Sequence, residues 1–318
     1  MSYPHQVVDV AAAVITRADG SFLLARRPEG KPYSGYWEFP GGKVNGGESL
    51  KHALDRELQE ELAIHVQQAY PWITRIFTYS HATVRLCFYR VVKWHGEPQP
   101  CEKQELSWQS AGNVTVEPML PANAPILRAL RLPPVYAITN AAEWGTEKTL
   151  TRVERALQDG TRLLQVREKA MAKTALSTFT HQIVALAHHY HADVLLNVSG
   201  SDGSSDLNAS GADGIHLSSA QLMSRETRPD AKWCGASCHN AEELARAEQL
   251  GLDFAVLAPV LPTLSHPGMP SLGWRTVAAL IRNCSIPVYA LGGLGHEDLT
   301  TAWEHGAHGI AIMRAMGR

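Results

Sequence analysis

One short segment, residues 41–62, carries a concentration of carboxylates that could bind a metal ion. It reads GGKVNGGESLKHALDRELQEEL, and its acidic residues are Glu48, Asp55, Glu57, Glu60 and Glu61. On a helix Glu57, Glu60 and Glu61 stand at i, i+3 and i+4, so all three project from one face. Carboxylates this close repel one another unless a cation offsets their charge. The spacing therefore predicts either a solvated acidic face or a site for a divalent cation.

The flanking sequence favours the cation site. Four glycines form a tight loop directly before the predicted helix. Arg56 stands beside the acidic residues and can pair with Glu48, and Lys43 lies in the loop within reach of a phosphate. Carboxylate oxygens are hard ligands that suit Mg²⁺ or Mn²⁺, which keep several waters and bridge substrate phosphates. We therefore predict a Mg²⁺ (or Mn²⁺) site that takes a phosphorylated ligand.

This segment resembles the Nudix box, G-x5-E-x7-R-E-U-x-E-E-x-G-U, where U is aliphatic. The matching residues are Gly42, Glu48, Arg56, Glu57, Leu58, Glu60, Glu61 and Ile64. Ala63 replaces the final glycine of the box. The stretches LLARRPEG, WEFPGGK, KWHGEP and PANAP are similar, in order and spacing, to the MutT group of 8-oxo-dGTP diphosphatases. This resemblance covers residues 7 to about 131, with one departure at Ala82, where the MutT pattern has an arginine near the substrate.

The resemblance implies a hydrolase that splits a nucleoside triphosphate into a monophosphate and pyrophosphate by attack at the β-phosphorus. The metal ligands that it implies are the Gly41 carbonyl, Glu57, Glu60, Glu61 and Glu102. Its catalytic residues would be Glu57, Glu48, Arg56 and Glu60, with Glu57 orienting or deprotonating the attacking water.

The resemblance also implies a set of substrate-binding residues. They are Arg27 and Lys43 for the nucleotide, and Phe39 and Asn123 for the base. Two of these residues have structural alternatives. Asn123 precedes Ala-Pro and a helical pattern, which is equally consistent with a helix N-cap. Phe39 is expected to belong to the hydrophobic core as well as to the substrate wall.

The first half of the chain has an α+β pattern. Apolar, β-branched runs predict strands at 7–16, 21–27, 73–80 and 83–94 in a mainly antiparallel or mixed sheet. The helix at about 49–62 lies among them, and a second helix begins near Asn123. Pro133-Pro134 cannot continue a helix, so we place a domain boundary there and expect domains at 1–132 and 133–318.

The second half alternates strands with amphipathic helices. The predicted strands are residues 135–139, 163–168, 193–198, 214–217, 234–238, 254–260, 288–293 and 309–314. Eight β/α units in sequence predict a (β/α)8 TIM barrel, although the third helix, around 203–210, is short and rich in Ser, Asp and Gly. The fold class is therefore α/β, with an N-terminal Nudix α/β/α sandwich followed by the barrel.

Residues 135–318 resemble thiamine phosphate synthase and its relative TenI, an aminothiazole tautomerase. The resemblance rests on LLQVREKA, DGIHLSSAQL, CGASCHNAEELARAEQLGLDFAVLAPVLPT, IPVYALGGL and GAHGIAIMRA. It implies a barrel ligand site formed by Gln165, Arg167, Lys169, His239, Gly292 and Gly293. His239 stands where TenI has its catalytic histidine, and the glycine pair ends strand seven, at the usual phosphate site of such barrels.

The barrel sequence departs from the synthase pattern at three positions. Asn197-Val198 stands where the synthase has Asn-Asp, Gln221 replaces an acidic Mg²⁺ ligand, and His266 replaces a lysine. We therefore expect a degenerate barrel that binds a small phosphorylated ligand without making thiamine phosphate, because the leaving pyrophosphate would lack its metal.

Composition sets limits on the protein's partners and location. The net charge is −2, and the charges are balanced in both halves, so we expect no nucleic-acid partner. No apolar stretch reaches the roughly 18 residues of a membrane span, and no basic region precedes the N-terminal apolar run. The five cysteines form no CxxC pair, so we expect free thiols in a cytoplasmic protein. The sequence leaves the oligomeric state open.

Three functions remain open from the sequence. The first is a nucleotide-sanitising hydrolase of 8-oxo-dGTP, of the kind that protects DNA. The second is a thiamine-pathway enzyme whose Nudix domain hydrolyses pyrimidine diphosphates or their toxic analogues. In the third, the barrel is a non-catalytic ligand-sensing module.

Overall fold

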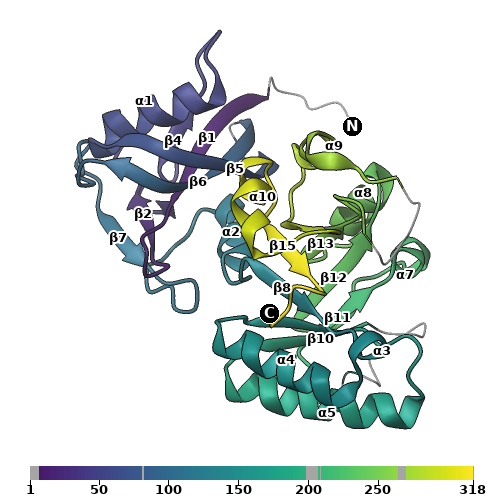
Figure 1. Cartoon of the computed structure of the whole chain (residues 1–318). Helices are drawn as coiled ribbons and strands as arrows, with labels where there is room; N and C mark the ends of the chain where they lie inside the picture. The colour runs from purple at the N-terminus through teal and green to yellow at the C-terminus, as the bar shows by residue number, and fades with distance from the viewer. Residues whose placement is uncertain (1–6, 81, 198–206, 208, 264–269, 318) are drawn as a thin grey trace. The chain divides into compact units, whose positions relative to one another are not determined.

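The computed structural model describes residues 7–80, 82–197, 207, 209–263 and 270–317 (Figure 1). The chain divides into two compact units, Met1–Arg131 and Leu132–Arg318. Within the described residues, no helix is both long and apolar enough to cross a membrane.

The N-terminal unit contains two sheets. A mixed sheet has the order β4 (Gly41–Lys43), β1 (Val8–Ile15), β6 (Thr83–His95), β5 (His65–Thr78). In it β1 and β6 run parallel, and the other neighbours are antiparallel. A smaller antiparallel sheet has the order β3 (Trp37–Glu38), β2 (Phe22–Arg26), β7 (Leu106–Gln109). The helical segments are α1 (Leu50–Leu62), η1 (Pro121–Asn123) and α2 (Ala124–Ala129).

Strand β1 separates two hydrophobic cores because its side chains alternate between the faces of the sheet. Ala11, Ala13 and Ile15 pack with the buried face of α1, whereas Ala12 and Val14 pack in a second cluster that includes residues of α2. Helices therefore cover both faces of the mixed sheet, and the predicted α/β/α sandwich is confirmed.

The sequence prediction missed part of this unit. Strand β5 begins at His65, eight residues before the predicted start at 73, and the short strands β3, β4 and β7 were not predicted. The early part of β5 reads HVQQAY and lacks a clear apolar alternation, so its pairing with β6 becomes visible only in the folded sheet.

Helix α1 fixes the direction of the acidic face by burying the opposite one. Its buried residues are Ala53, Leu54, Leu58 and Leu62. Ser49 caps the helix start by accepting a hydrogen bond from the His52 N–H at 3.2 Å. The helix ends at Ala63, which adopts the left-handed conformation, with φ 55° and ψ 34°. Because that conformation favours glycine, it explains why the Nudix box has glycine at this position.

The C-terminal unit is a closed barrel of eight parallel strands (Figure 1). They are β8 (Val135–Ile138), β9 (Leu163–Val166), β10 (Asp193–Asn197), β11 (Gly214–Leu217), β12 (Trp233–Cys238), β13 (Phe254–Leu257), β14 (Val288–Leu291) and β15 (Gly309–Ile312). Each lies at a predicted strand position, so the predicted TIM barrel is confirmed.

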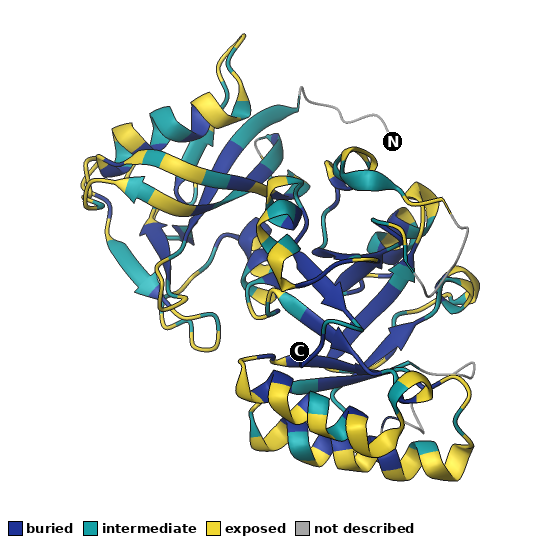
Figure 2. Cartoon of the chain, viewed as in Figure 1, coloured by how far each residue is buried: buried dark blue, intermediate teal, exposed yellow. Residues whose placement is uncertain are grey.

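Helices surround this barrel. They are α3 (Ala141–Trp144), α4 (Thr146–Gln158), α5 (Lys173–His189), α7 (Ser219–Ser224), α8 (Ala241–Gln249), α9 (Gly273–Ile281), η2 (His296–Asp298) and α10 (Leu299–Glu304). Most of the predicted helix at 203–210 lies outside the described residues. Figure 2 shows the strands almost wholly buried, whereas α4 and α5 expose their outer faces.

Large aromatic side chains fill the barrel interior. Tyr136, Phe254 and Tyr289 belong to the inner core, and the Phe254 ring lies 5.2 Å from that of Tyr136 and 5.3 Å from that of Tyr289, measured between centroids. A Cβ atom at Gly235 would lie 2.4 Å from the Phe254 ring, so glycine leaves the space that this ring occupies. The interior is thus closed by packing, and polar chemistry is confined to the strand ends.

The left-handed Ala63 predicts a stabilising substitution. Ala63→Gly should raise the free energy of unfolding by about 0.5–1 kcal/mol, because glycine adopts this conformation without the steric cost that alanine carries. Ala63 is exposed, so little packing is lost. In the full chain, hydrogen–deuterium exchange of the α1 amides should slow by a factor of about 2–5. The contrasting variant is Gln59→Gly, in the exposed interior of α1, which should accelerate exchange. If exchange in Ala63→Gly is no slower than in the parent protein, the explanation is wrong.

Candidate functional sites

A cavity of about 430 Å³ in the N-terminal unit brings together many of the predicted site residues. Its lining includes Arg27, Phe39, Gly41, Gly42, Lys43, Glu57, Glu61 and Asn123. The predicted residues Glu48, Arg56, Glu60 and Glu102 are not part of this lining. The cavity therefore joins an acidic wall from α1 to cationic and aromatic groups from the loops.

Arg56 connects the carboxylates of the Nudix box behind this wall. Its Nε and Nη2 donate to the two oxygens of Glu48, both at 3.0 Å, as the predicted pair requires. Its Nη1 donates to Glu57 Oε1 at 2.8 Å and to Glu60 Oε2 at 3.2 Å. Nη2 also donates to the Lys43 carbonyl, which ties the glycine loop to the helix. The guanidinium lowers the pKa of Glu48 and offsets the charge of all three carboxylates.

Two glycines let the loop approach these carboxylates closely. A Cβ atom at Gly42 would lie 2.2 Å from the Glu57 carboxyl carbon. Gly41 has φ 138°, and its Cβ would lie 2.1 Å from the Ala11 carbonyl oxygen. Its N–H donates to Glu61 Oε2 at 3.2 Å. Larger residues would push the loop away from the helix, so the acidic groups and the loop backbone form one cradle.

Glu61 is a partly buried carboxyl group of the cavity wall. Burial raises its pKa to about 7; the Gly41 N–H opposes this rise, and the nearby charges of Glu38 and Glu102 add to it. Lys31 Nζ pairs with Glu102 Oε2 at 2.5 Å. Burial also raises the pKa of Glu38, although Arg27 Nη1 donates to both of its oxygens at 2.6 Å.

These groups fit a hard divalent cation. The donors are carboxylate oxygens and a loop backbone. Burial raises the pKa of Glu61, with smaller contributions from Glu38 and Glu102, and a bound cation would favour its charged form. Among the described residues, no three acidic, histidine or cysteine side chains converge on one point. Instead, Arg56 and Lys31 pair with the carboxylates.

Two residues predicted to bind the base, Phe39 and Asn123, line the same cavity. Asn123 is 4% exposed and lies at the N-cap position of α2, but its side chain makes no capping hydrogen bond. Asn123 thus occupies the N-cap position without capping the helix through its side chain, and it is one of the residues that line the cavity. Phe39 packs against Phe22 and Phe88 with ring centroids 5.8 Å apart in both pairs, so it serves as core and as cavity wall.

Several cavity residues were not predicted from the sequence. Tyr33, Tyr79, Lys31 and Glu38 line the cavity, and the Tyr33 and Tyr79 ring centroids are 5.3 Å apart. Tyr33 and Tyr79 are 46 positions apart in the chain, so no local pattern connects them. Glu38 could have been predicted, because it stands next to the predicted site residue Phe39 in WEFPGGK.

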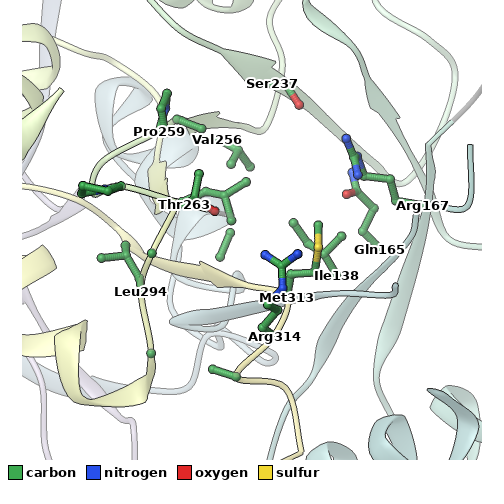
Figure 3. Close-up of a pocket in the computed structure, with 18 of the residues that line it drawn as sticks. Ile138, Gln165, Arg167, Ser237, Val256, Pro259, Thr263, Leu294, Met313 and Arg314 are labelled. Atoms are coloured by element: carbon green, nitrogen blue, oxygen red, sulfur yellow. The ribbon is translucent and has the colours of Figure 1, made fainter. Parts of the chain in front are cut away.

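A second cavity, of about 460 Å³, lies at the carboxyl ends of the barrel strands (Figure 3). The predicted residues Gln165, Arg167, His239, Gly292 and Gly293 line it. Lys169 is exposed and is not among the lining residues. Gln165 is 1% exposed, and its Nε2 has no hydrogen-bond partner in the described part of the chain. A buried donor without a partner favours a ligand that presents an acceptor.

A chain of hydrogen bonds forms the polar floor of this cavity. His216 Nε2 lies 3.0 Å from Ser237 Oγ, and His216 Nδ1 lies 3.2 Å from the Tyr136 hydroxyl. Burial, with a smaller effect of the Arg167 charge, lowers the pKa of His216 to about 3, so the ring is neutral at physiological pH. At the rim, His239 Nδ1 lies 3.0 Å from Glu243 Oε2.

Arg314 is a further cationic group that the sequence prediction did not assign. Figure 3 shows Arg314 and Arg167 pointing into the same cavity from different strands. Arg314 Nε donates to Glu143 Oε2 at 2.9 Å. Its place directly after the last barrel strand was the available signal, because ligands of such barrels bind at that end.

The structure accounts for one departure from the synthase pattern. Gln221 forms a capping box at the start of α7, where its Oε1 accepts hydrogen bonds from the Ser218 N–H at 2.8 Å and Oγ at 2.9 Å. Its side chain is thus committed to the helix end and does not line the cavity. The departures at Val198 and His266 lie outside the described residues.

Comparison with known proteins finds relatives for both units. Residues 6–130 match the NUDIX domain family, and residues 135–316 match the thiamine monophosphate synthase family. The chain is 39% identical over 124 residues to the CTP pyrophosphohydrolase of Escherichia coli, covering 39% of this chain and 91% of that protein. It is 36% identical over 125 residues to the 8-oxo-dGTP diphosphatase of Haemophilus influenzae, covering 39% and 92%. It is 34% identical over 182 residues to the thiamine-phosphate synthase of Thermus thermophilus, covering 56% and 86%.

The raised pKa of Glu61 predicts a pH dependence of stability in the presence of a chelator. Folded Glu61 keeps its proton up to about pH 7, whereas the unfolded residue loses it near its ordinary pKa of 4.5, so the free energy of unfolding falls as pH rises through this window. Glu61→Gln removes this fall. Between pH 5 and pH 8 the variant should gain about 2–3 kcal/mol relative to the parent protein. Urea unfolding measures this difference in the free energy of unfolding, with hydrogen exchange of the α1 amides as the readout. If the pH profiles of the variant and the parent protein stay parallel, the pKa of Glu61 is not raised in the folded state.

Proposed function

Because residues 6–130 belong to the Nudix family and residues 135–316 to the thiamine monophosphate synthase family, we propose that this Nudix hydrolase is a metal-dependent 8-oxo-dGTP pyrophosphohydrolase. The observation that carries the proposal is the buried Asn123 amide, which lines the same cavity as the acidic face of α1. An amide that can both donate and accept suits the edge of an oxidised guanine. The 36% identity to the Haemophilus influenzae 8-oxo-dGTP diphosphatase supports this substrate.

The proposed reaction is the hydrolysis of a nucleoside triphosphate to a monophosphate and pyrophosphate. The Gly41 carbonyl, Glu57, Glu60, Glu61 and Glu102 would hold Mg²⁺ or Mn²⁺, which when bound neutralises phosphate charge and lowers the pKa of water. Glu57 orients a water molecule or takes its proton as the water attacks the β-phosphorus. The bond from the β-phosphorus to the α–β bridging oxygen breaks, the nucleoside monophosphate leaves with that oxygen, and pyrophosphate carries the oxygen of the water.

Other residues of the cavity would bind and orient the substrate. Arg27 and Lys43 present cationic groups to the nucleotide, and Phe39 forms an apolar wall for the base. Arg56 keeps Glu48, Glu57 and Glu60 side by side without entering the cavity. Its role is therefore to position the catalytic carboxylate.

For the barrel we propose binding of a small phosphorylated molecule without synthesis of thiamine phosphate. Gly292 and Gly293 have φ 114° and 69°, and a Cβ atom at either would approach the loop after β13 to 3.0 Å or less. Such a glycine turn exposes backbone N–H groups that can bind a phosphate without a metal. Arg167 and the buried Nε2 of Gln165 supply further donors.

A second candidate function is a thiamine-pathway enzyme that hydrolyses pyrimidine diphosphates. The fusion to a synthase-like barrel favours it, and the 39% identity to a CTP pyrophosphohydrolase shows that a related domain acts on a pyrimidine nucleotide. In both functions the protein would be cytoplasmic, a location that its five free thiols support. A screen of the full chain with 8-oxo-dGTP, dGTP, CTP and pyrimidine diphosphates separates the two functions.

The acidic cradle predicts the effect of removing its catalytic carboxylate. Glu57→Gln should lower kcat for the preferred triphosphate by about 10²–10⁴-fold at saturating Mg²⁺, because the group that orients or deprotonates water is lost. Glu97→Gln removes an exposed glutamate and is the matched control. A Glu57→Gln variant that keeps more than about a tenth of the activity would rule out this role.

The position of Asn123 predicts its effect on selectivity. Asn123→Ala should lower kcat/KM for 8-oxo-dGTP more than for dGTP, by about 10-fold or more, because a buried polar contact to the oxidised base is lost. Steady-state kinetics with both substrates measure the ratio. An equal loss for both would mean that Asn123 supports the cavity wall and does not distinguish the bases.

The barrel cavity predicts an anion site in the full chain. Inorganic phosphate should shift the amide NMR signals of Gly292 and Gly293, and Arg167→Met should weaken this binding about 10-fold. Lys169→Met, an exposed change outside the cavity, is the control and should have little effect. The same chain should fail to support growth of a strain that lacks thiamine phosphate synthase. Growth that depends on Arg167 would instead show that the barrel is a working synthase.

A further inference from the structure

Lys31 occupies a central position among the acidic groups of the N-terminal cavity. It lies in the loop between β2 and β3, and its Nζ pairs with Glu102 Oε2 at 2.5 Å. The two side chains are 43% and 42% exposed, so both can change partner without rearranging the core. Lys31 also lines the cavity.

The ammonium group of Lys31 pairs directly with Glu102, and Lys31 lines the same cavity as Glu38 and Glu61. Partial burial lowers the pKa of Lys31, but the hydrogen bond to Glu102 and the charges of Glu102, Glu61 and Glu38 outweigh it and raise the pKa. Glu61 comes from α1, Glu38 from β3, and Glu102 from the segment between β6 and β7. The ion pair with Glu102 and the shared cavity thus place the lysine ammonium among acidic groups that no single element brings together.

We propose that Lys31 is an internal counter-ion of the metal site, which neutralises Glu102 before a divalent cation binds and pairs with substrate phosphate once the cation has replaced it. This inference rests on the proposed function. If both bound the same carboxylate, the lysine nitrogen and the divalent cation would lie roughly 4–5 Å apart and repel each other strongly. Lys31 and the metal therefore compete for Glu102.

The chemistry of lysine suits this exchange of partners. Its ammonium is a point charge on a flexible four-carbon stem, so it can turn from one oxygen to another. Arg27 is less suited, because its Nη1 is held by both oxygens of Glu38 at 2.6 Å. Lys31 and Lys43 thus lie in the cavity as cations that can meet a triphosphate.

A Mn²⁺ titration of the full chain without nucleotide, read by electron paramagnetic resonance of the free ion, tests the competition. Lys31→Met should tighten Mn²⁺ binding about 5- to 10-fold, because the competing charge is removed while Glu102 stays. Lys51→Met removes one exposed charge from α1 and controls for the general change in net charge; it should alter the affinity by less than about 2-fold. Lys31→Arg keeps the charge and should bind Mn²⁺ nearly as the parent does. Unchanged or weaker binding in Lys31→Met, or in Lys31→Gln if the methionine variant does not fold, overturns the proposal.

The second arm of the test concerns the substrate. At saturating Mn²⁺, Lys31→Met should raise KM for the triphosphate several-fold and change kcat less. If Lys31 had only a structural role, its substitution would leave the Mn²⁺ affinity measured in the first arm unaltered. Hydrolysis of 8-oxo-dGTP without any change in Mn²⁺ affinity overturns the role of Lys31 and leaves the proposed function intact. Tighter Mn²⁺ binding without hydrolysis of any triphosphate supports the role of Lys31 and overturns the proposed function.

Discussion

The guanidinium of Arg56 is the interaction on which the acidic face of α1 depends. Without a cation, Glu57 and Glu60 of α1 and Glu48 of the preceding loop would repel one another. Arg56 donates to all three and also to the Lys43 carbonyl, so it holds helix and loop together. Because it lies outside the cavity, the charges are offset on one side while Glu57 still lines the cavity on the other. Arg56 is thus the permanent counter-ion of the cluster, in contrast to the exchangeable one that Lys31 supplies.

In the barrel, too, polar groups lie beside a hydrophobic core, but there the buried group is neutral instead of being paired with a counter-ion. Its aromatic interior makes ionisation costly, and His216 accordingly stays neutral between Tyr136 and Ser237. Charge appears only farther out, where Arg167 and Arg314 meet the cavity. The buried Nε2 of Gln165 has no partner among the described residues, which leaves the floor of the cavity ready for a ligand's acceptor.

The elements that the sequence revealed are those whose side chains follow a local rule. The eight barrel strands are short and largely buried, so each could be found as an apolar run between helices. Helix α1 was visible from the spacing of Glu57, Glu60 and Glu61 and from the match to the Nudix box. The first half of β5 follows no such rule, because its polar residues are held by pairing with β6. A strand that owes its conformation to a neighbour cannot be identified from its own composition.

The sequence by itself determined the acidic face of the N-terminal unit, because Glu57, Glu60 and Glu61 lie within one helical turn and the helix period fixes their common direction. It also determined the pairing of Arg56 with Glu48, which lies two helical turns away. Only the tertiary structure decided that Lys31 meets Glu102, 71 positions along the chain, and that the Asn123 amide lines the cavity instead of capping α2. Those contacts depend on where loops from separate strands converge. Short-range periodicity carries no information on that convergence, because it is set by the packing of the whole sandwich.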